Sequence, residues 1–166
     1  MNKMKEIAIE KVVLSISATA ENLEKGKLLL ERITEKKAAK RTTRKRIPTL
    51  GVRPGLEIGV IVTLRGKKAI EILKRLISVV DNKIKEKQIS GNSFSFGIKE
   101  YIEIPGMKYQ RDIGIMGFDV SVAFSRKGKR VEERKIRRAK MPKKQRISKE
   151  EILEYLNKIG INRREK

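Results

Sequence analysis

Residues 55–77 read GLEIGVIVTLRGKKAIEILKRLI, and they predict a strand that runs directly into a helix. Every second residue from Ile58 to Leu64 is large and apolar, whereas the opposite face of this strand carries the polar Thr63 and Arg65. Beyond the next glycine the apolar residues recur at the spacing of one helical face. The unit is typical of an α+β fold in which a helix packs on a sheet.

The rest of the chain repeats these two patterns. At the last helix, Ser148 and Glu151 have the spacing of a capping box, and Gly160 follows the last apolar position. We therefore predict an α+β protein with an antiparallel β-sheet, helices packed on one face, a long basic loop and a C-terminal helix. The predicted strands are 6–17, 58–64, 94–104 and 118–124, and the predicted helices are 19–37, 67–80 and 148–159.

The positive charge is concentrated in two segments. The chain carries a formal net charge of +22, of which residues 35–54 contribute +7 and residues 126–149 contribute +11. We therefore divide the chain into an α+β core, 1–125, with a basic loop at 35–54, and a second region, 126–166. The second region holds a basic extension and the C-terminal helix, which we expect to pack on the same domain.

Such an excess of positive charge destabilises a folded chain by self-repulsion unless a polyanion neutralises it. Nucleic acid is the partner that this pattern favours, since Lys and Arg displace counterions from a phosphate backbone. The alternatives are a solvated, irregular loop and a membrane surface. Membrane binding is disfavoured because few apolar residues interrupt the charges between Arg126 and Arg146. The basic side chains of the loop are Lys36, Lys37, Lys40, Arg41, Arg44, Lys45, Arg46 and Arg53.

The residue types that most enzymes use are missing. The sequence has no Cys, His or Trp, which removes thiol nucleophiles, cysteine-ligated metals and the usual general base. Four carboxylates could hold Mg²⁺ for phosphoryl chemistry, but their spacing matches no metal-binding loop. We expect neither catalysis nor a cofactor or metal. The four carboxylates are Glu100, Glu103, Asp112 and Asp119.

Several motifs occur in the order and spacing of one family. The most specific is residues 58–66, IGVIVTLRG, followed by Glu71 and by the pair at 76–77. On these motifs the chain resembles ribosomal protein five of the large subunit, in its archaeal and eukaryotic form, from Lys11 to about Ile159. The other motifs are Ile33-Thr34, Arg44 to Ile47, Gly55, Ser93-Phe94, Gly97 to Glu100, Ile104-Pro105 and Gly117 to Val120.

The resemblance implies a non-catalytic, cytoplasmic ribosomal protein with several partners. These are 5S rRNA, large-subunit rRNA, the P-site tRNA and the small-subunit ribosomal protein thirteen. Residues expected to lie toward rRNA are Ser15, Lys36, Lys37, Thr63, Arg65, Arg126, Lys127, Lys129 and Arg130. Those expected toward tRNA are Arg41, Arg44, Lys45, Arg46 and Arg53, and those expected at an intersubunit bridge are Lys108, Tyr109 and Arg111.

One departure from the family pattern affects the expected contacts. The family usually has Gly-Gln before the basic loop, where this chain has Glu35 and Lys36. A phosphate contact by Lys36 is therefore expected in place of an amide contact. Two alternative functions remain at this stage: a non-ribosomal nucleic-acid protein that reuses the fold, and a metal-dependent nuclease.

Overall fold

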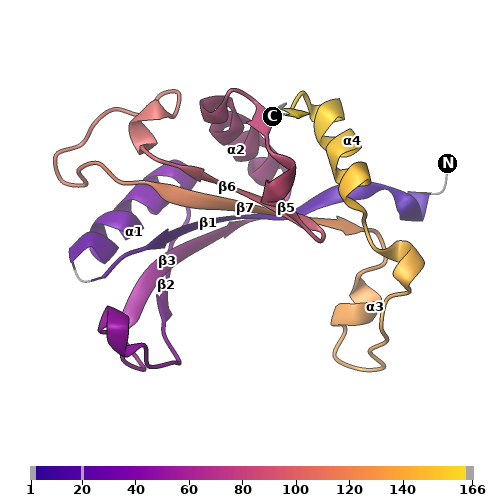
Figure 1. Ribbon diagram of the computed structural model, residues 1–166, viewed down its shortest axis with the longest axis horizontal. Helices are drawn as coiled ribbons and strands as arrows, with labels where there is room; N and C mark the ends of the chain where they lie inside the picture. The colour runs from indigo at the N-terminus through magenta and orange to yellow at the C-terminus, as the bar shows by residue number, and fades with distance from the viewer. Residues whose placement is uncertain (1–2, 20, 164–166) are drawn as a thin grey trace.

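The computed structural model describes residues 3–19 and 21–163, and its centre is a six-stranded antiparallel sheet (Figure 1). The strands lie in the order β2-β3-β1-β7-β6-β5, so the long N-terminal strand β1 pairs with both β3 and β7. The strands are β1 Ile7–Ser17, β2 Ala39–Thr42, β3 Glu57–Leu64, β5 Ile89–Ser90, β6 Ser93–Ile98 and β7 Phe118–Arg126. Two short strands, β4 Lys83–Ile84 and β8 Asn162–Arg163, form a separate parallel pair.

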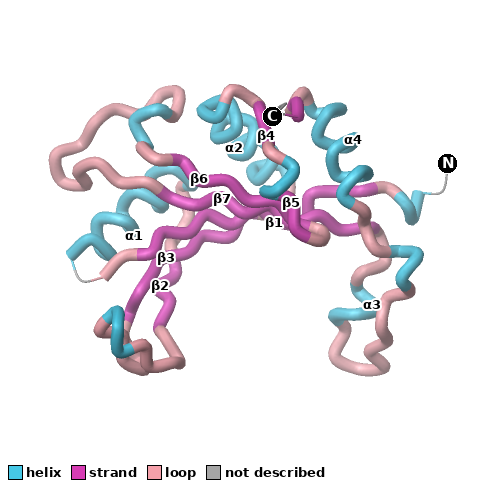
Figure 2. The backbone as a smooth tube through the Cα atoms, viewed as in Figure 1, coloured by secondary structure: helices cyan, strands magenta, loops and turns pink. Residues whose placement is uncertain are grey.

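Three helices pack on one face of the sheet: α1 Glu21–Thr34, α2 Lys67–Ile77 and α4 Lys149–Ile159 (Figure 2). Their buried apolar side chains join those of the strands in a single core. Burial of this surface stabilises the fold by roughly 25 cal/mol for each Å² removed from water. The fourth helix, α3 Arg130–Glu133, is one turn in the basic extension and contributes no buried residue.

Gly26 lies in the middle of α1, where a glycine is usually unfavourable by roughly 1 kcal/mol relative to alanine. The structure gives the reason. A Cβ atom at this position would lie 3.2 Å from Cγ2 of Ile16 and 3.4 Å from the sulfur of Met116. The glycine therefore lets α1 approach the central strand closely.

The last helix begins and ends as its sequence predicts. The Ser148 hydroxyl accepts a hydrogen bond from the Glu151 amide, and the Glu151 carboxylate accepts one from the Ser148 amide. Gly160 ends the helix with φ of 90°, a left-handed conformation that favours glycine. Ile152 and Leu156 lie in the core, which packs α4 against the sheet.

The predicted fold class is confirmed, and two details are wrong. Residues 39–42, predicted as irregular loop, form the edge strand β2, which pairs with β3. Sequence alone missed it because all four of its side chains are exposed, so no apolar alternation marks it. The strand predicted over 94–104 ends at Ile98, and Tyr101 is buried where Ile102 was expected. The end of the predicted region 126–166 includes 164–166, which lie outside the described residues.

Figure 1 shows how the two basic segments are placed. The β2–β3 connection and the extension after β7 project from opposite ends of the sheet, both away from α2 and α4. From here on, the basic loop means its projecting part, residues 43–56. The basic extension means residues 127–147. Together with the sheet they form an arch. No helix of the described chain has the length and apolar character that crossing a membrane requires.

Candidate nucleic-acid interface

The face of the sheet that carries no helix lies between the two basic segments, and we call it the open face. Its side chains alternate along each strand with the core residues. They are mostly small, and many carry hydroxyl groups. The open face comprises Val13, Ser15 and Ser17 on β1, Gly59, Ile61 and Thr63 on β3, Ser93, Ser95 and Gly97 on β6, and Asp119, Ser121, Ala123 and Ser125 on β7.

The strand register places these small side chains in rows across the sheet. Val13 lies opposite both Thr63 and Ser121, and Ser121 lies opposite Ser95. Ser15 occupies the next row, so the two predicted rRNA contacts, Ser15 and Thr63, share this face on neighbouring strands. Hydroxyl groups both donate and accept hydrogen bonds, and small side chains let a bulky ligand approach the backbone.

Two glycines keep the open face flat. A Cβ atom at Gly59 would lie 2.9 Å from the backbone oxygen of Ile16, which is too close for any side chain. A Cβ atom at Gly97 would lie 3.3 Å from Oδ1 of Asp119. The β3–β1 junction therefore admits only glycine at position 59 without a shift of the backbone.

The basic loop has a defined shape. The amide of Thr43 donates to the oxygen of Leu56 at 2.9 Å, and the amide of Gly55 donates to the oxygen of Thr43 at 2.9 Å. Nearer the tip, the amides of Ile47 and Val52 each donate to the other residue's oxygen. The loop is therefore a hairpin held by backbone hydrogen bonds, and it continues β2 and β3 beyond the end of the sheet.

All five predicted tRNA contacts lie on or beside this hairpin and are exposed. In the part of the chain that the structure describes, none of the five forms an ion pair. Three of them line a groove of about 710 Å³, where the hairpin meets the end of β1 and where Ser15 and Ser17 also lie. The five residues are Arg41, Arg44, Lys45, Arg46 and Arg53, of which the first three line the groove.

Lys40 differs from its basic neighbours. Its ammonium group pairs with the carboxylates of Glu24 on α1 and Glu57 on β3. The hydrogen bond from Lys40 to Glu24 raises the pKa of the lysine most, and the bond to Glu57 raises it further. The bond from Lys40 in turn lowers the pKa of Glu24. Lys40 therefore holds β2 against α1, and its charge is already neutralised within the protein.

Two ion pairs attach the basic extension to the N-terminal part of the chain, and a third lies within the extension itself. Lys127 pairs with Glu6 at 3.0 Å, and Lys129 pairs with Glu10 and Glu133. Burial acts to lower the pKa of Lys129, but hydrogen bonds to the two carboxylates outweigh it and raise the pKa. Lys127 and Lys129, both predicted to contact rRNA, are therefore already paired with carboxylates of the protein, although Lys127 remains exposed.

Arg126 differs from the other predicted rRNA contacts because its side chain is buried and paired within the protein. Its side chain is only 6% exposed, and it pairs with the Glu151 carboxylate at 2.6 Å. Because β7 continues its alternation two residues beyond Phe124, Arg126 points to the helix-covered side. Its role in the folded chain is to fasten the start of α4 to the end of β7. We therefore omit Arg126 from the residues proposed to meet RNA on the open face.

The remaining predicted rRNA contacts are all exposed. Lys36 and Lys37 lie between α1 and β2, Arg65 directly follows β3, and Arg130 begins α3. None of them shares an ion pair with another residue of the described chain. They lie in connections or at the start of α3, outside the strands that form the open face.

The segment between β6 and β7 presents the residues predicted for an intersubunit bridge. Lys108, Tyr109 and Arg111 are exposed, and the Tyr109 side chain is 55% exposed. The segment is anchored by the buried Ile113 and by Tyr101, whose hydroxyl accepts a hydrogen bond from the Gln110 amide at 2.9 Å. Three exposed side chains are thus carried on a supported loop.

The four carboxylates considered for a magnesium site do not come together. Among residues 3–19 and 21–163, no group of three or more acidic side chains is placed to hold a metal ion. Asp119 lies on the open face within β7, whereas Glu100, Glu103 and Asp112 belong to the β6–β7 connection. The arrangement gives no support to a two-metal nuclease.

Comparison with known proteins agrees with this geometry. The family model for the C-terminus of the ribosomal L5 proteins matches residues 57–155. The large ribosomal subunit protein uL5 of Nanoarchaeum equitans is 46% identical over 95% of this chain and 96% of its own length. The chain belongs to the ribosomal L5 family. The corresponding protein of Archaeoglobus fulgidus is 38% identical over 96% of this chain and 91% of its own length. That of Methanosphaera stadtmanae is 41% identical over 94% of this chain and 95% of its own length.

Membership of this family makes the chain a structural constituent of the large ribosomal subunit, associated with rRNA, and not an enzyme. The predicted family and the predicted lack of catalysis are therefore confirmed.

Sequence reasoning missed most of the open face. It singled out Ser15 and Thr63, but not Ser95, Ser121 and Ser125, which share the same surface. The signal was present, because these serines alternate with buried phenylalanines and valines along 93–98 and 118–126. Recognising it required the strand order, which brings β6 and β7 beside β1.

The ion pair between Arg126 and Glu151 gives a testable pH dependence. The hydrogen bond from the Ser148 amide, and then the Arg126 guanidinium, lower the pKa of Glu151 below its ordinary 4.5. The ionised carboxylate therefore contributes stability above that value, and the contribution is lost as pH falls through the lowered folded pKa. Glu151→Gln should lower the free energy of unfolding by roughly 1–2 kcal/mol at pH 7. This is less than for a fully buried ion pair, because water screens the partly exposed carboxylate.

Urea denaturation at pH 7 and at pH 3 measures this effect. The difference between wild type and Glu151→Gln should shrink as the pH falls through the lowered folded pKa, because the wild-type carboxylate then takes up a proton. The neighbouring Glu150→Gln removes the same charge from the same helical turn and should have little effect at either pH. An equal loss in both variants would contradict the assigned role.

Proposed function

We propose that this protein anchors 5S rRNA to the large ribosomal subunit by seating the RNA on the open face. The observation that carries the proposal is the arch: a flat, hydroxyl-bearing sheet face with a basic segment projecting at each end, on the same side (Figure 1). RNA laid on this face would meet hydroxyl groups below it and cations at both ends. The family comparison supports rRNA as the ligand.

Recognition on this face would depend on RNA shape and backbone. All four phenylalanines are buried, and Tyr109 in the β6–β7 connection is the one aromatic side chain of the described residues that is largely exposed. Base stacking on the sheet is therefore not available. Serine and threonine hydroxyls can instead bond phosphate oxygens and ribose 2′-hydroxyls, and the latter distinguish RNA from DNA.

The proposal assigns the basic loop to the P-site tRNA. The hairpin projects beyond the sheet edge, and its tip carries unpaired cations and the 73%-exposed Leu50. Arg44, Lys45 and Arg46 are free to meet phosphates, whereas Lys40 at the base is not. A defined hairpin loses little conformational entropy on binding, which suits a contact that forms and breaks repeatedly.

Two further contacts complete the proposal. Lys36 is exposed and forms no ion pair within the described chain, which supports a phosphate contact where the family usually has an amide. Lys108, Tyr109 and Arg111 would form an intersubunit bridge with the small-subunit ribosomal protein thirteen. Their exposure on the anchored β6–β7 connection supports this assignment.

A negative charge on the open face tests the RNA seat. Ser121→Glu should weaken 5S rRNA binding at least tenfold, because the carboxylate would oppose the phosphate backbone at the centre of the sheet. Ser78→Glu makes the same change beside α2, on the helix-covered side, and should change affinity less than about threefold. Filter binding at fixed salt measures both, with thermal melting to verify folding. Equal affinity losses would rule out the open face as the seat.

The division of labour between the two surfaces is tested on the loop. Replacing Arg44, Lys45 and Arg46 together by Ala should speed P-site tRNA dissociation from ribosomes carrying the variant, and should reduce 5S rRNA affinity much less. The matched control replaces Lys67, Lys74 and Lys83, which are exposed on α2 and β4, by Ala. Faster tRNA release in the control, or a greater loss of 5S rRNA binding than of tRNA retention, would contradict the assignment.

A further inference from the structure

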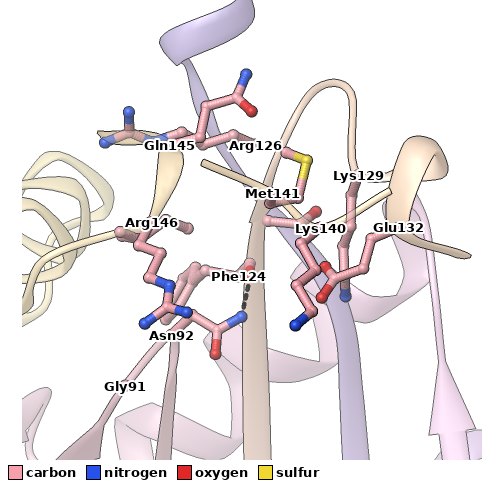
Figure 3. Close-up of a pocket in the computed structure, with 12 residues that line it drawn as sticks. Gly91, Asn92, Phe124, Arg126, Lys129, Glu132, Lys140, Met141, Gln145 and Arg146 are labelled. Carbon is pink, nitrogen blue, oxygen red and sulfur yellow. Dashed lines mark hydrogen bonds between the residues drawn. The ribbon is translucent and has the colours of Figure 1, made fainter. Parts of the chain in front are cut away.

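A second polar cavity lies at one end of the open face, between the end of the β6–β7 pair and the basic extension (Figure 3). Its volume is about 650 Å³. Phe124 and Arg126 of its lining point toward the helix-covered side of β7, whereas Ser125 belongs to the open face, so the cavity adjoins the surface proposed for 5S rRNA. We call it the extension pocket; its polar side chains are Asn92, Ser125, Arg126, Lys129, Glu132, Lys140, Gln145 and Arg146.

Some of the cations around the extension pocket are paired with carboxylates, and others are not. Arg126 and Lys129 are held by Glu151, Glu10 and Glu133, as described above. The side chains of Lys140 and Arg146, in contrast, have no ion pair or hydrogen bond within the described chain. Of the side chains lining the pocket, four are cationic and one, Glu132, is acidic. The pocket therefore contains two cations whose charge no other described residue neutralises.

Figure 3 shows how these two cations are directed. The Lys140 ammonium and the Arg146 guanidinium approach from opposite sides and extend toward the amide of Asn92. The Asn92 amide is itself fixed, because its Nδ2 donates to the backbone oxygen of Phe124 at 3.3 Å. Two like charges on either side of one amide repel each other, and an anion bound beside that amide would reduce the repulsion.

We propose that the extension pocket binds a phosphate group of an RNA strand. The Arg146 guanidinium suits two-point contact with phosphate oxygens, and the Lys140 ammonium acts as a point charge from the other side. The source of the phosphate rests on the proposed RNA-binding function, whereas the site itself does not. On this proposal the protein holds RNA both on the open face and in a pocket that adjoins it at the end of the sheet beside α4.

The site is tested first with inorganic phosphate and the whole chain. Phosphate should produce a saturable shift of the Arg146 Nε–H signal in ¹⁵N NMR, with ionic strength held constant by chloride. Lys140→Ala should weaken this binding about tenfold, since one charge-assisted contact is lost. Lys135→Ala, an exposed lysine of the same extension that does not line the pocket, should leave it unchanged. Linear shifts without saturation, or equal effects of the two variants, would overturn the site.

The source of the phosphate is tested with 5S rRNA. Lys140→Ala combined with Arg146→Ala should reduce the slope of log affinity against log salt by about 0.7–0.9, the value for one phosphate contact. Lys67→Ala combined with Lys74→Ala removes the same charge from α2 and should leave the slope unchanged. An unchanged slope for the pocket variant, despite saturable phosphate binding, would overturn RNA as the source and indicate a free phosphate or nucleotide.

These two arms separate the pocket from the proposed function. If the wild-type chain fails to bind 5S rRNA, the proposed function fails, and the phosphate titration still decides the pocket. If 5S rRNA binds normally but phosphate does not saturate the Arg146 signal, the pocket proposal alone is overturned. Both variants leave the Arg126–Glu151 pair intact, so matching melting temperatures verify that neither result arises from unfolding.

Discussion

Strands send successive side chains to opposite faces of a sheet, and in this protein that constraint separates the core-forming residues from the face proposed to bind RNA. Along β1, β3, β6 and β7, one set of alternate residues is large, apolar and covered by α1, α2 and α4. The other set is small and hydroxyl-rich. A one-residue shift in any strand would exchange the two sets, so the apolar core fixes the register that also builds the open face.

The positive charges are divided in a comparable way. Lys40, Arg126 and Lys129 are paired with carboxylates at the bases of the two basic segments. They hold the segments in place and have no free charge for a ligand. Exposed cations further along each segment, for example Arg44 and Arg46, have no such partners within the described chain. Paired cations near the sheet therefore position unpaired cations at the two ends of the arch.

Much of the fold could be predicted because its signals are local. The strand–helix unit at 57–77 and the capped helix at 149–159 appear where alternation, helical spacing and the Ser148–Glu151 box place them. The edge strand β2 could not be predicted, because its exposed side chains leave no pattern and only pairing with β3 defines it. Tyr101 was missed because a turn after Ile98 ends the alternation that pointed to residue 102.

The interface was predictable in its charge and less so in its geometry. Composition indicated a polyanion, and the resemblance to a ribosomal family indicated which kind. Neither could show that Arg126 is buried against Glu151, since that depends on where α4 packs. The rows of serines likewise depend on strand order. Sequence thus identified the ligand class, whereas tertiary structure decides which cations are free to meet it.

The seat of the RNA can be tested most directly by chemical protection, because the natural chain contains no cysteine. Ser95→Cys places a thiol on the open face, and Ser78→Cys places one beside α2; both positions are exposed. Alkylation rates would be measured with and without saturating 5S rRNA. The account predicts that 5S rRNA slows alkylation at position 95 and leaves position 78 unchanged. Protection at 78 with free reaction at 95 would contradict it.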